Sequence, residues 1–287
     1  MFSRVKNLAL RLRKFLKRLP EVWALTRSTN DPYAAIFTPY ASMPGGYENS
    51  SAERNLDLLN MDKLGIPMQH RAVFLAINKA VRSYMYGDQY DPSHDYEHIQ
   101  RVVKYVRKIY IAEKNAGRLS PHLDVTTMYL AALMHDVGET KYFEKGRTQE
   151  EVVVEMMLEC GASLEIANKV ATIAVNVSFT RELKAVDRTL INAIIEVHPE
   201  LAFVQDADRL DALGPSGQIR CSVYGGANEE RRKQSIHTGV QLHHKRFQYY
   251  LGMMKTRTGR AIAEQKWSWM VNFRRDWHED TDVSSVL

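Results

Sequence analysis

The amino-acid sequence predicts an all-α fold, and three observations support this prediction. From Pro67 onward, apolar residues recur at the three- and four-residue spacing of one helix face, in one segment after another. Signals that begin and end helices, including glycines, fall between these segments. Short β-branched runs occur as well, but no hairpin-turn signal lies beside them, so helices fit these runs better than strands do.

The first two predicted helices follow from their apolar stripes. Residues 67–87 keep apolar side chains in step from Val73 to Met85. Residues 94–117 place five apolar side chains on one face and end at Gly117, and glycine favours the end of a helix. Both helices should bury one face in a core. The five side chains are Ile99, Val102, Val103, Val106 and Tyr110.

The next helices are predicted from their end signals. Ser120–Pro121 can start a helix that runs to the pair His135–Asp136 and stops near Gly138. Thr148 has the spacing of a capping box with the glutamate three residues later, and a glycine at position 161 closes that helix. The runs VATIAVNV and INAIIEV are predicted to form buried helices because their neighbours are helical.

The composition agrees with a folded protein that has one large domain. The chain has 287 residues, enough for one substantial core or for a domain with extensions. Its two cysteines, Cys160 and Cys221, do not form a Cys-x-x-Cys pair, so a reducing compartment is expected. No apolar run approaches the length that spans a bilayer, and no transmembrane segment is predicted.

Residues 1–20 differ from the rest of the chain in charge. They contain seven Lys or Arg and no acid, while the whole chain has a net charge of +5, so the remainder carries −2. The body is therefore not basic, and no nucleic-acid partner is predicted. Apolar residues recur at helical spacing within residues 1–20. Three interpretations stay open: a mitochondrial transit peptide, a helix on an anionic membrane, or a basic tail with no role.

The predicted organisation has three parts. A basic amphipathic segment covers residues 1–20, a linker-like region covers 21–66, and a helical domain covers 67–280. The linker prediction rests on five prolines and glycines between residues 26 and 53, where no apolar period is sustained. A cytoplasmic or mitochondrial location is expected, with peripheral membrane contact through residues 1–20 as an open alternative.

Three short segments carry the candidate chemistry. They are HDYEHIQRV (94–102), LMHDVGETK (133–141) and QDADRLDALG (205–214). Imidazole nitrogens and carboxylates form a mixed donor set, which suits a borderline or hard divalent ion able to activate water. The candidates that the segments supply are His98, His135, Asp136 and Asp208.

The order and surroundings of these segments resemble the HD superfamily of metal-dependent phosphohydrolases. The resemblance is to the bacterial and fungal branch with HD-x-x-H-x-x-RV, AA-L-x-HD-x-G and QDADRLDA-x-G. It runs from about residue 67 to about residue 280, and residues 254–273 are similar to the family's trailing helix. It implies an HD-domain helical fold with a flexible basic N-terminal extension. Some members of this branch look like nucleoside triphosphate pyrophosphohydrolases.

The resemblance implies one divalent metal ion bound by four side chains. Mn²⁺ or Mg²⁺ is expected first, and Co²⁺, Ni²⁺, Fe²⁺ or Zn²⁺ also suits the donors. Residues 170–183 contain no histidine, which argues for a single ion, although His198 could come close through folding. The ligands implied are His98, His135, Asp136 and Asp208.

The resemblance also selects among competing residues. It maps the first ligand to His98 rather than to His94. It maps the last ligand to Asp208, the aspartate of the D-R-L step, which leaves Asp206 and Asp211 as caps, hydrogen-bond partners or helix-end charges.

The adjacent ligands His135 and Asp136 impose a geometric condition. On a regular helix their side chains would diverge by about 100°. Both can reach one ion only where the helix ends or bends, and Gly138 supplies such an end.

Further charged residues are candidates for catalysis. Glu139 resembles the acid that handles a proton near the ion, with a solvated helix-end glutamate as its alternative. His94 could orient a leaving group or cap its helix. Arg101 and Lys141 match basic positions of the family and are natural phosphate partners. An exposed lysine without a role is the alternative for Lys141.

Two more arginines complete the predicted substrate site. Arg209 is expected to neutralise part of the charge of the neighbouring carboxylates and to contact substrate. Arg220 and the turn at residues 224–226 resemble family positions that could contact substrate.

The predicted function is therefore metal-assisted hydrolysis of a phosphoester or phosphoanhydride, with a nucleotide as the expected substrate. Two alternatives stay open. One is hydrolysis of a non-nucleotide metabolite, and the other is a catalytically idle HD fold used for binding or as a scaffold. Intact residues at all four ligand positions favour an enzyme.

Overall fold

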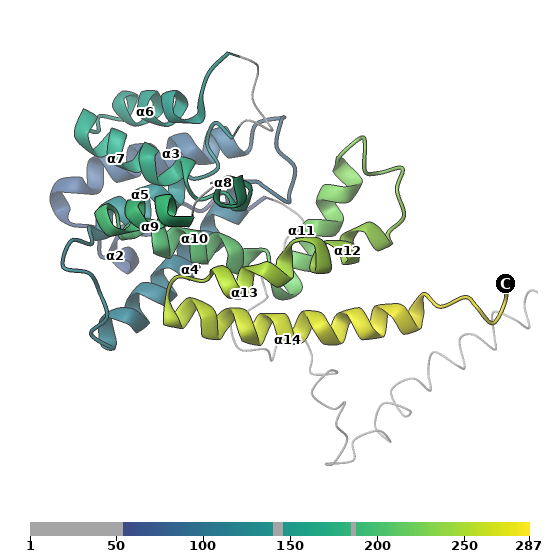
Figure 1. Cartoon of the computed structure of the whole chain (residues 1–287). Coiled ribbons are helices and arrows are strands. Elements are labelled where there is room, and N and C mark those ends of the chain that lie inside the picture. Colours follow the sequence, from purple (N-terminus) through teal and green to yellow (C-terminus); the bar gives the residue numbers. More distant parts are fainter. Residues whose placement is uncertain (1–53, 140–145, 185–187) are drawn as a thin grey trace, which may run out of the picture. The chain divides into compact units, whose positions relative to one another are not determined.

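The computed structural model describes residues 54–139, 146–184 and 188–287, and every regular element in these ranges is a helix (Figure 1). The predicted all-α fold is confirmed. None of the described helices is both long and apolar enough to cross a bilayer. Residues 1–20, most of the predicted linker and Lys141 lie outside the described residues.

The helical domain includes residues that precede the predicted boundary at residue 67. Residues 55–287 form one compact unit. The backbone N–H of Asn55 donates to the Glu97 carboxylate at 2.9 Å, and helix α2 (Met61–Leu64) follows shortly afterwards. The segment from residue 55 onward is therefore bonded to the domain, although it falls within the region predicted to be linker-like.

Three helices build the first half of the core. They are α3 (Arg71–Met85), which follows the short 3₁₀ turn η3 (Met68–His70), then α4 (Tyr96–Asn115) and α5 (Val125–Met134). Nine of the ten residues of α5 are buried, because α3, α4, α7 and α10 pack around it. The apolar stripe predicted for α4 is confirmed by the burial of Ile99, Val102, Val103 and Val106.

Helix α5 begins later than predicted. Asp124 is its N-cap and accepts the backbone N–H of Thr127 at 2.6 Å. Ser120 and Pro121 precede it in a turn, where the Ser120 hydroxyl accepts the N–H of His122 at 3.2 Å. The predicted start at Ser120–Pro121 was wrong because these residue types also suit turns, and a stronger cap lies closer to the apolar run.

The helices α6 (Gln149–Glu159) and α7 (Leu164–Val175) pack against each other. The predicted capping box is confirmed: the Thr148 hydroxyl accepts the Glu151 N–H at 3.2 Å, and the Glu151 carboxylate accepts the Thr148 N–H at 2.7 Å. Gly161 follows α6 with φ +85°. The VATIAVNV run forms the buried end of α7, as predicted.

The helices α8 (Phe179–Lys184) and α9 (Arg188–Val197) lie on the outside of the bundle. The INAIIEV run is helical as predicted, but it is not buried. Ile191 is buried, whereas Val197 is 67% exposed. The prediction of burial was wrong because α9 turns only one face toward its neighbours α8 and α10.

Helix α10 (Glu200–Asp211) runs through the centre of the domain against α4, α5 and α14. Eleven of its twelve residues are buried, and Asp208 is the exception. The carboxylate of Asp208 is therefore accessible on a helix that is otherwise enclosed, which indicates a functional site at that position.

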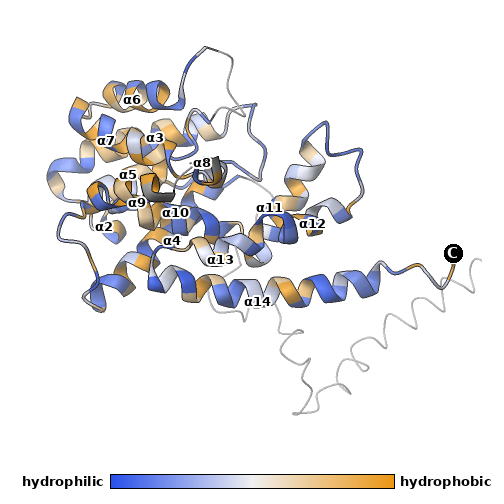
Figure 2. Cartoon of the chain, viewed as in Figure 1, coloured by the Kyte–Doolittle hydropathy of each residue, from blue (hydrophilic) through white to orange (hydrophobic). Residues whose placement is uncertain are grey.

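The C-terminal part contains α11 (Gly214–Ala227), α12 (His237–Lys245), η4 (Phe247–Tyr249), α13 (Tyr250–Met253) and the long α14 (Arg257–Asp280). Helix α14 corresponds to the predicted trailing helix and packs on α4, α10 and α11. Apolar residues gather where the central helices meet, and polar residues cover much of the outward surface (Figure 2).

Candidate metal centre

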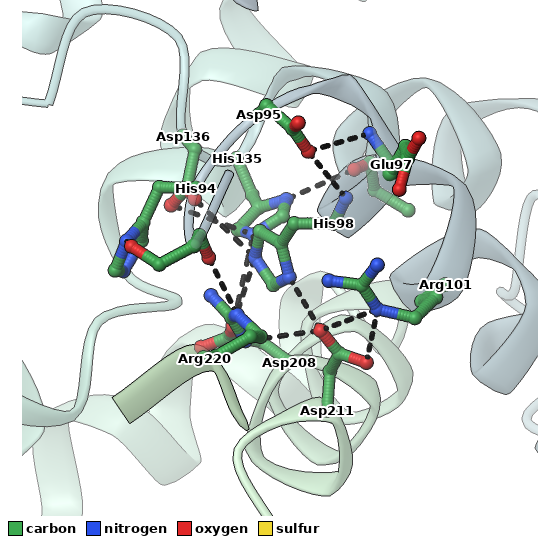
Figure 3. A network of polar contacts seen from close by, with 12 residues as sticks. His94, Asp95, Glu97, His98, Arg101, His135, Asp136, Asp208, Asp211 and Arg220 are labelled. Carbon is green, nitrogen blue, oxygen red and sulfur yellow. Dashed lines mark hydrogen bonds and ion pairs between the residues drawn. The ribbon is translucent and has the colours of Figure 1, made fainter. Parts of the chain in front are cut away.

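Four side chains from three elements converge in the domain (Figure 3). The Nε2 atom of His98 on α4 lies 3.3 Å from His135 Nε2, 3.3 Å from Asp136 Oδ2 and 3.5 Å from Asp208 Oδ1. His135 Nε2 lies 3.4 Å from Asp136 Oδ1 and 3.8 Å from Asp208 Oδ1. The structure thus brings together all four residues selected from the sequence as candidate ligands.

The end of α5 allows two adjacent residues to face one point. The helix stops at Met134, and His135 and Asp136 stand in the turn that follows. This turn ends at Gly138, whose φ of +72° favours glycine. A Cβ atom there would lie only 2.9 Å from the Cβ of Val152 on α6. The geometric condition set by the His135–Asp136 pair is met by a helix end.

The hydrogen bonds of the two imidazoles define their protonation. His98 Nδ1 lies 2.8 Å from Asp211 Oδ2, and His135 Nδ1 lies 2.9 Å from the carbonyl oxygen of Ala132. Both oxygens only accept, so each Nδ1 carries the proton in the neutral ring. Each Nε2 then presents a lone pair toward the other imidazole and toward the carboxylates of Asp136 and Asp208. Such outward support is usual for metal-binding histidines.

This donor set fits a divalent cation. Lone pairs and carboxylate oxygens repel one another at short range unless a positive charge lies between them. Atoms bonded at about 2.1 Å to one ion lie about 3.0 Å apart along an octahedral edge and about 3.4 Å apart along a tetrahedral edge. The separations of 3.3 to 3.8 Å in the cluster are close to these values. His98, His135 and Asp208 alone already place three such atoms within 4.8 Å of one another.

The three aspartates of α10 have different partners. Residues two apart on a helix diverge by about 200°, whereas Asp208 and Asp211 lie about 60° apart and share one side. They flank the two nitrogens of the His98 ring (Figure 3). Asp206 faces elsewhere and accepts the backbone N–H groups of residues 255–256 at 2.8 Å each, where α14 begins. The predicted supporting roles of Asp206 and Asp211 agree with this geometry.

Asp211 holds His98 from behind. Its carboxylate is fully buried and accepts the His98 Nδ1–H, Arg101 Nε–H at 2.9 Å and Arg220 Nη1–H at 3.0 Å. Burial would raise the pKa of this carboxyl, but His98 and the two arginines hold its pKa well below the usual value. A charged Asp211 therefore fixes both the orientation and the tautomer of His98.

A cavity opens beside the cluster. Its lining includes His135, Asp136 and Asp208 on one side. Aromatic side chains, among them Phe179 and Tyr224, form other parts of its wall. The cavity thus joins the candidate metal ligands to a surface on which a planar group could lie.

Three of the predicted catalytic and substrate residues line this cavity: His94, Glu139 and Arg220. His94 Nδ1 lies 2.6 Å from the Ser93 hydroxyl, so Nε2 is the nitrogen turned to other partners. The Arg220 Nε–H donates to the Ser93 carbonyl at 2.6 Å while its Nη1–H donates to Asp211. These bonds hold a cation and an imidazole beside the cluster.

Residues 95–213 match the model of the HD domain, a range that contains the whole cluster. The chain therefore contains an HD domain over these residues. It is 29% identical over 191 residues to the uncharacterized protein YpgQ of Bacillus subtilis (strain 168), which covers 65% of this chain and 84% of YpgQ.

Solved structures show the same fold. A crystal structure of YpgQ in complex with ADP has a TM-score of 0.55 and 25% identity, and the match covers 75% of this chain and 98% of YpgQ. An HD-superfamily hydrolase from Bacillus thuringiensis has a TM-score of 0.51 and 22% identity over 74% of this chain and 98% of that chain. The similarity to the Bacillus thuringiensis structure shows a shared fold alone.

Two arginines of the HD domain bond to buried carboxylates. Arg209 is buried, forms an ion pair with Glu182 and donates to the Met253 carbonyl at 3.2 Å. It faces a different side of α10 from Asp208, because adjacent residues of a helix diverge by about 100°. Arg101 donates to Asp211 and is not among the residues that line the cavity, and its contact with substrate stays a prediction.

Other predictions near the site have mixed outcomes. The predicted turn at residues 224–226 is the last part of helix α11, and Tyr224 lines the cavity from it. His198 is not in the cluster and interacts with Glu200 and Lys169 instead. Lys141 falls outside the described residues, so its role stays a prediction.

Sequence analysis missed the far wall of the cavity, where Arg231 and Arg246 lie with aromatic residues. The Arg-Arg pair at 231–232 and the HHKR run at 243–246 were available signals. Basic runs usually form solvated surfaces, however, and no local pattern indicates which member lines the cavity. The long-range packing of α11 and α12 decides it.

Proposed function

We propose that this HD domain is a metal-dependent phosphohydrolase that hydrolyses a phosphoester or phosphoanhydride bond of a nucleotide. The observation that carries the proposal is the convergence of two imidazole lone pairs with two carboxylates. The Nε2 atoms of His98 and His135 lie 3.3 Å apart, beside Asp136 and Asp208. The HD fold supports a metal-dependent phosphohydrolase in general.

The proposed ligands of the ion are His98, His135, Asp136 and Asp208. A bound Mn²⁺ or Mg²⁺, or another first-row divalent ion, would supply Lewis acidity to a water molecule and to a phosphoryl oxygen. Asp208 suits this task because it is the one residue of α10 that is not buried. It faces the cavity while Asp211 keeps His98 in place behind it.

The remaining residues of the site have complementary roles in the proposal. The Arg220 guanidinium, fixed by Ser93 and Asp211, places positive charge at the cavity wall for the developing negative charge on phosphate. The water oxygen bonds to phosphorus as the bond from phosphorus to the leaving oxygen breaks. Glu139 accepts a proton of the water, and His94 Nε2 supplies a proton to the leaving oxygen.

A nucleotide is proposed as substrate because the cavity combines cationic and aromatic residues. The faces of Tyr224 and Phe179 that the guanidiniums of Arg231 and Arg246 leave open offer ring surfaces to a base, and Arg220 offers charge to a phosphate. The complex of the related YpgQ with ADP supports the same class of ligand. A phosphorylated metabolite without a base would leave the aromatic wall unused.

The test is a panel of nucleotides and simple phosphoesters, assayed after chelator treatment and restoration of Mn²⁺, Mg²⁺, Co²⁺, Ni²⁺, Fe²⁺ or Zn²⁺ in turn. We expect release of phosphate or pyrophosphate from a nucleotide with at least one ion, and the product identifies the bond that breaks. Asp136→Ala should abolish this activity and lower bound metal without unfolding the chain. Hydrolysis of sugar phosphates alone would favour the metabolite alternative, and no hydrolysis with any ion would favour an idle scaffold.

A further inference from the structure

Two arginines line the cavity from the region of α11 and α12. Arg231 lies in the segment between the two helices, where its backbone N–H donates to the Asn228 side chain at 3.2 Å. Arg246 follows the last residue of α12. In Figure 1 these two helices stand beside the main bundle, above the distal half of α14. Both arginines therefore come from the region beside the main bundle.

Each guanidinium rests on an aromatic ring of the cavity wall. The Arg231 Cζ atom lies 4.9 Å from the centre of the Tyr224 ring, and the Arg246 Cζ atom lies 4.9 Å from the centre of the Phe179 ring. The Arg246 Nε–H also donates to the Tyr250 hydroxyl at 2.8 Å. A ring face holds a guanidinium in place but leaves most of its N–H groups for other acceptors.

The two arginines differ from others of the chain in their partners. Arg101, Arg209 and Arg220 each bond to a buried carboxylate. Among the described residues, no ion pair joins Arg231 or Arg246 to a carboxylate, although the exposed neighbour Arg232 has one with Glu229 at 3.3 Å. Arg231 is half-buried and Arg246 is exposed. Two guanidiniums that line one cavity without an ion pair to a carboxylate are suited to an anion from outside.

Ring contacts connect Arg231 to the metal cluster. The His98 ring lies 6.0 Å from the His94 ring, which in turn lies 5.5 Å from the Tyr224 ring that carries Arg231. A series of ring contacts therefore leads from His98 through His94 and Tyr224 to Arg231. The arginine pair addresses a different group of the same ligand.

We infer that Arg231 and Arg246 form an anion subsite for a second phosphoryl group of the substrate. The inference rests on the proposed function, since it assigns the phosphoryl group that reacts to the cluster and Arg220. It makes the site selective for compounds with at least two phosphoryl groups over monophosphates. It also assigns the choice of substrate to the wall formed by Arg231 and Arg246 rather than to the metal cluster.

The test compares AMP and ADP binding to the full chain by isothermal titration calorimetry in chelator-treated buffer, where no divalent ion promotes turnover. The variants are Arg231→Gln, Arg246→Gln and the double change. Matched controls are Arg232→Gln, next to Arg231 and paired with Glu229, and Lys245→Gln, next to Arg246 and bonded to Gln241. We expect the double variant to weaken ADP binding roughly 10-fold or more, since two charge-assisted contacts are lost, and AMP binding by less than about 2-fold. The controls should leave both affinities within about 2-fold.

Equal loss of AMP and ADP affinity, unchanged ADP affinity, or equal effects of the control variants would overturn the subsite. Circular dichroism and melting temperature establish that each variant is folded, and the two single changes replace the double change if it is not. The hydrolysis panel answers a separate question. Selective loss of ADP binding in the variants, without any hydrolysis by the wild-type chain, would retain the subsite and reject the proposed function. Hydrolysis by the wild-type chain, with an ADP preference that the variants keep, would support the proposed function and reject the subsite.

Discussion

The two ends of the cavity are built on different principles. At the cluster end, His98 is enclosed and Asp211 fixes it through a buried network with Arg101 and Arg220. At the other end, Arg231 and Arg246 rest on aromatic rings near the surface. The first arrangement permits one geometry, as metal chemistry requires, and the second can adjust to a ligand. The same domain therefore separates a fixed reaction centre from an adaptable recognition surface.

The packing that supports the wall with Arg231 and Arg246, which we call the recognition wall, differs as well. Helix α12 is held on α14 by His243, which is fully buried among the rings of Phe247, Trp267 and Phe273. Its Nε2–H donates to the Gln218 side chain at 2.7 Å. Buried ion pairs hold the cluster in place, whereas aromatic side chains packed around one neutral imidazole hold the recognition wall in place. Four predictions examine this contrast.

The largest effect is expected from the buried network. Asp211→Ala would leave Arg101, Arg220 and the His98 Nδ1–H without their acceptor, and should lower the free energy of unfolding by about 3–5 kcal/mol. The control is Asp276→Ala, because Asp276 forms an exposed pair with Arg275 and its removal should cost less than about 1 kcal/mol. Urea denaturation measures both. Equal small losses would mean that the cluster is not held by buried charge.

The second prediction concerns the loss of stability at low pH that the buried His243 of the recognition wall should cause. Burial, followed by the charge of Arg274, lowers the pKa of His243 to about 4, against about 6.5 in the unfolded chain. Between these pH values the unfolded state binds the proton and the folded state does not, so stability is lost as the pH falls from 6.5 to 4, by up to about 3 kcal/mol. His243→Phe should reduce the fall in melting temperature over this range, and the exposed His244→Phe should not. An identical acid response in both variants would contradict the prediction.

The third prediction separates proton transfer from metal binding at the fixed end. Glu139→Gln keeps the size of the side chain but removes its proton chemistry, and should lower turnover by about 100-fold with the metal still bound. Glu155→Gln is the control, since Glu155 forms an exposed pair with Arg147. Metal content and initial rates measure the two properties. Near-normal turnover in the Glu139→Gln chain would remove this residue from the mechanism.

The smallest effect is expected from removing the N-terminus. A chain that begins at Ser51 should keep its melting temperature and activity, because the first described contacts of the domain start at Asn55. The full chain alone should bind anionic vesicles or enter mitochondria, with vesicle binding weakened by salt. A clear fall in melting temperature without membrane or organelle association would instead show that residues 1–20 pack on the domain.

The fold and the cluster were accessible from the sequence for identifiable reasons. Glycine at 138 and the Thr148–Glu151 pair are local signals, and the structure places helix ends at both. His98, Asp136 and Asp208 were found because three motifs specify them together. Local signals also mislead where two residues compete, as Asp124 does with the Ser–Pro pair before it.

What the sequence could not supply was the placement of charges by long-range packing. Arg209 was expected to contact substrate and to neutralise the neighbouring carboxylates, and the structure pairs it with Glu182, a residue that no motif near Asp208 indicates. Arg231 and Arg246 belong to basic runs that are ordinary on a surface, and only the packing of α11 and α12 turns them into the cavity. The spacing of residues along one helix predicts which way each side chain points, but it does not identify the helix that packs against that side chain.

The most direct test of the fixed centre is a crystal structure of the full chain with Mn²⁺, using anomalous diffraction to locate the ion. We expect one strong anomalous peak, with bonds of about 2.0–2.3 Å to Nε2 of His98 and His135 and to carboxylate oxygens of Asp136 and Asp208. Asp211 should remain on His98 Nδ1. An ion bound by Asp206 or Asp211 in place of Asp208, or no peak at the cluster, would contradict the account.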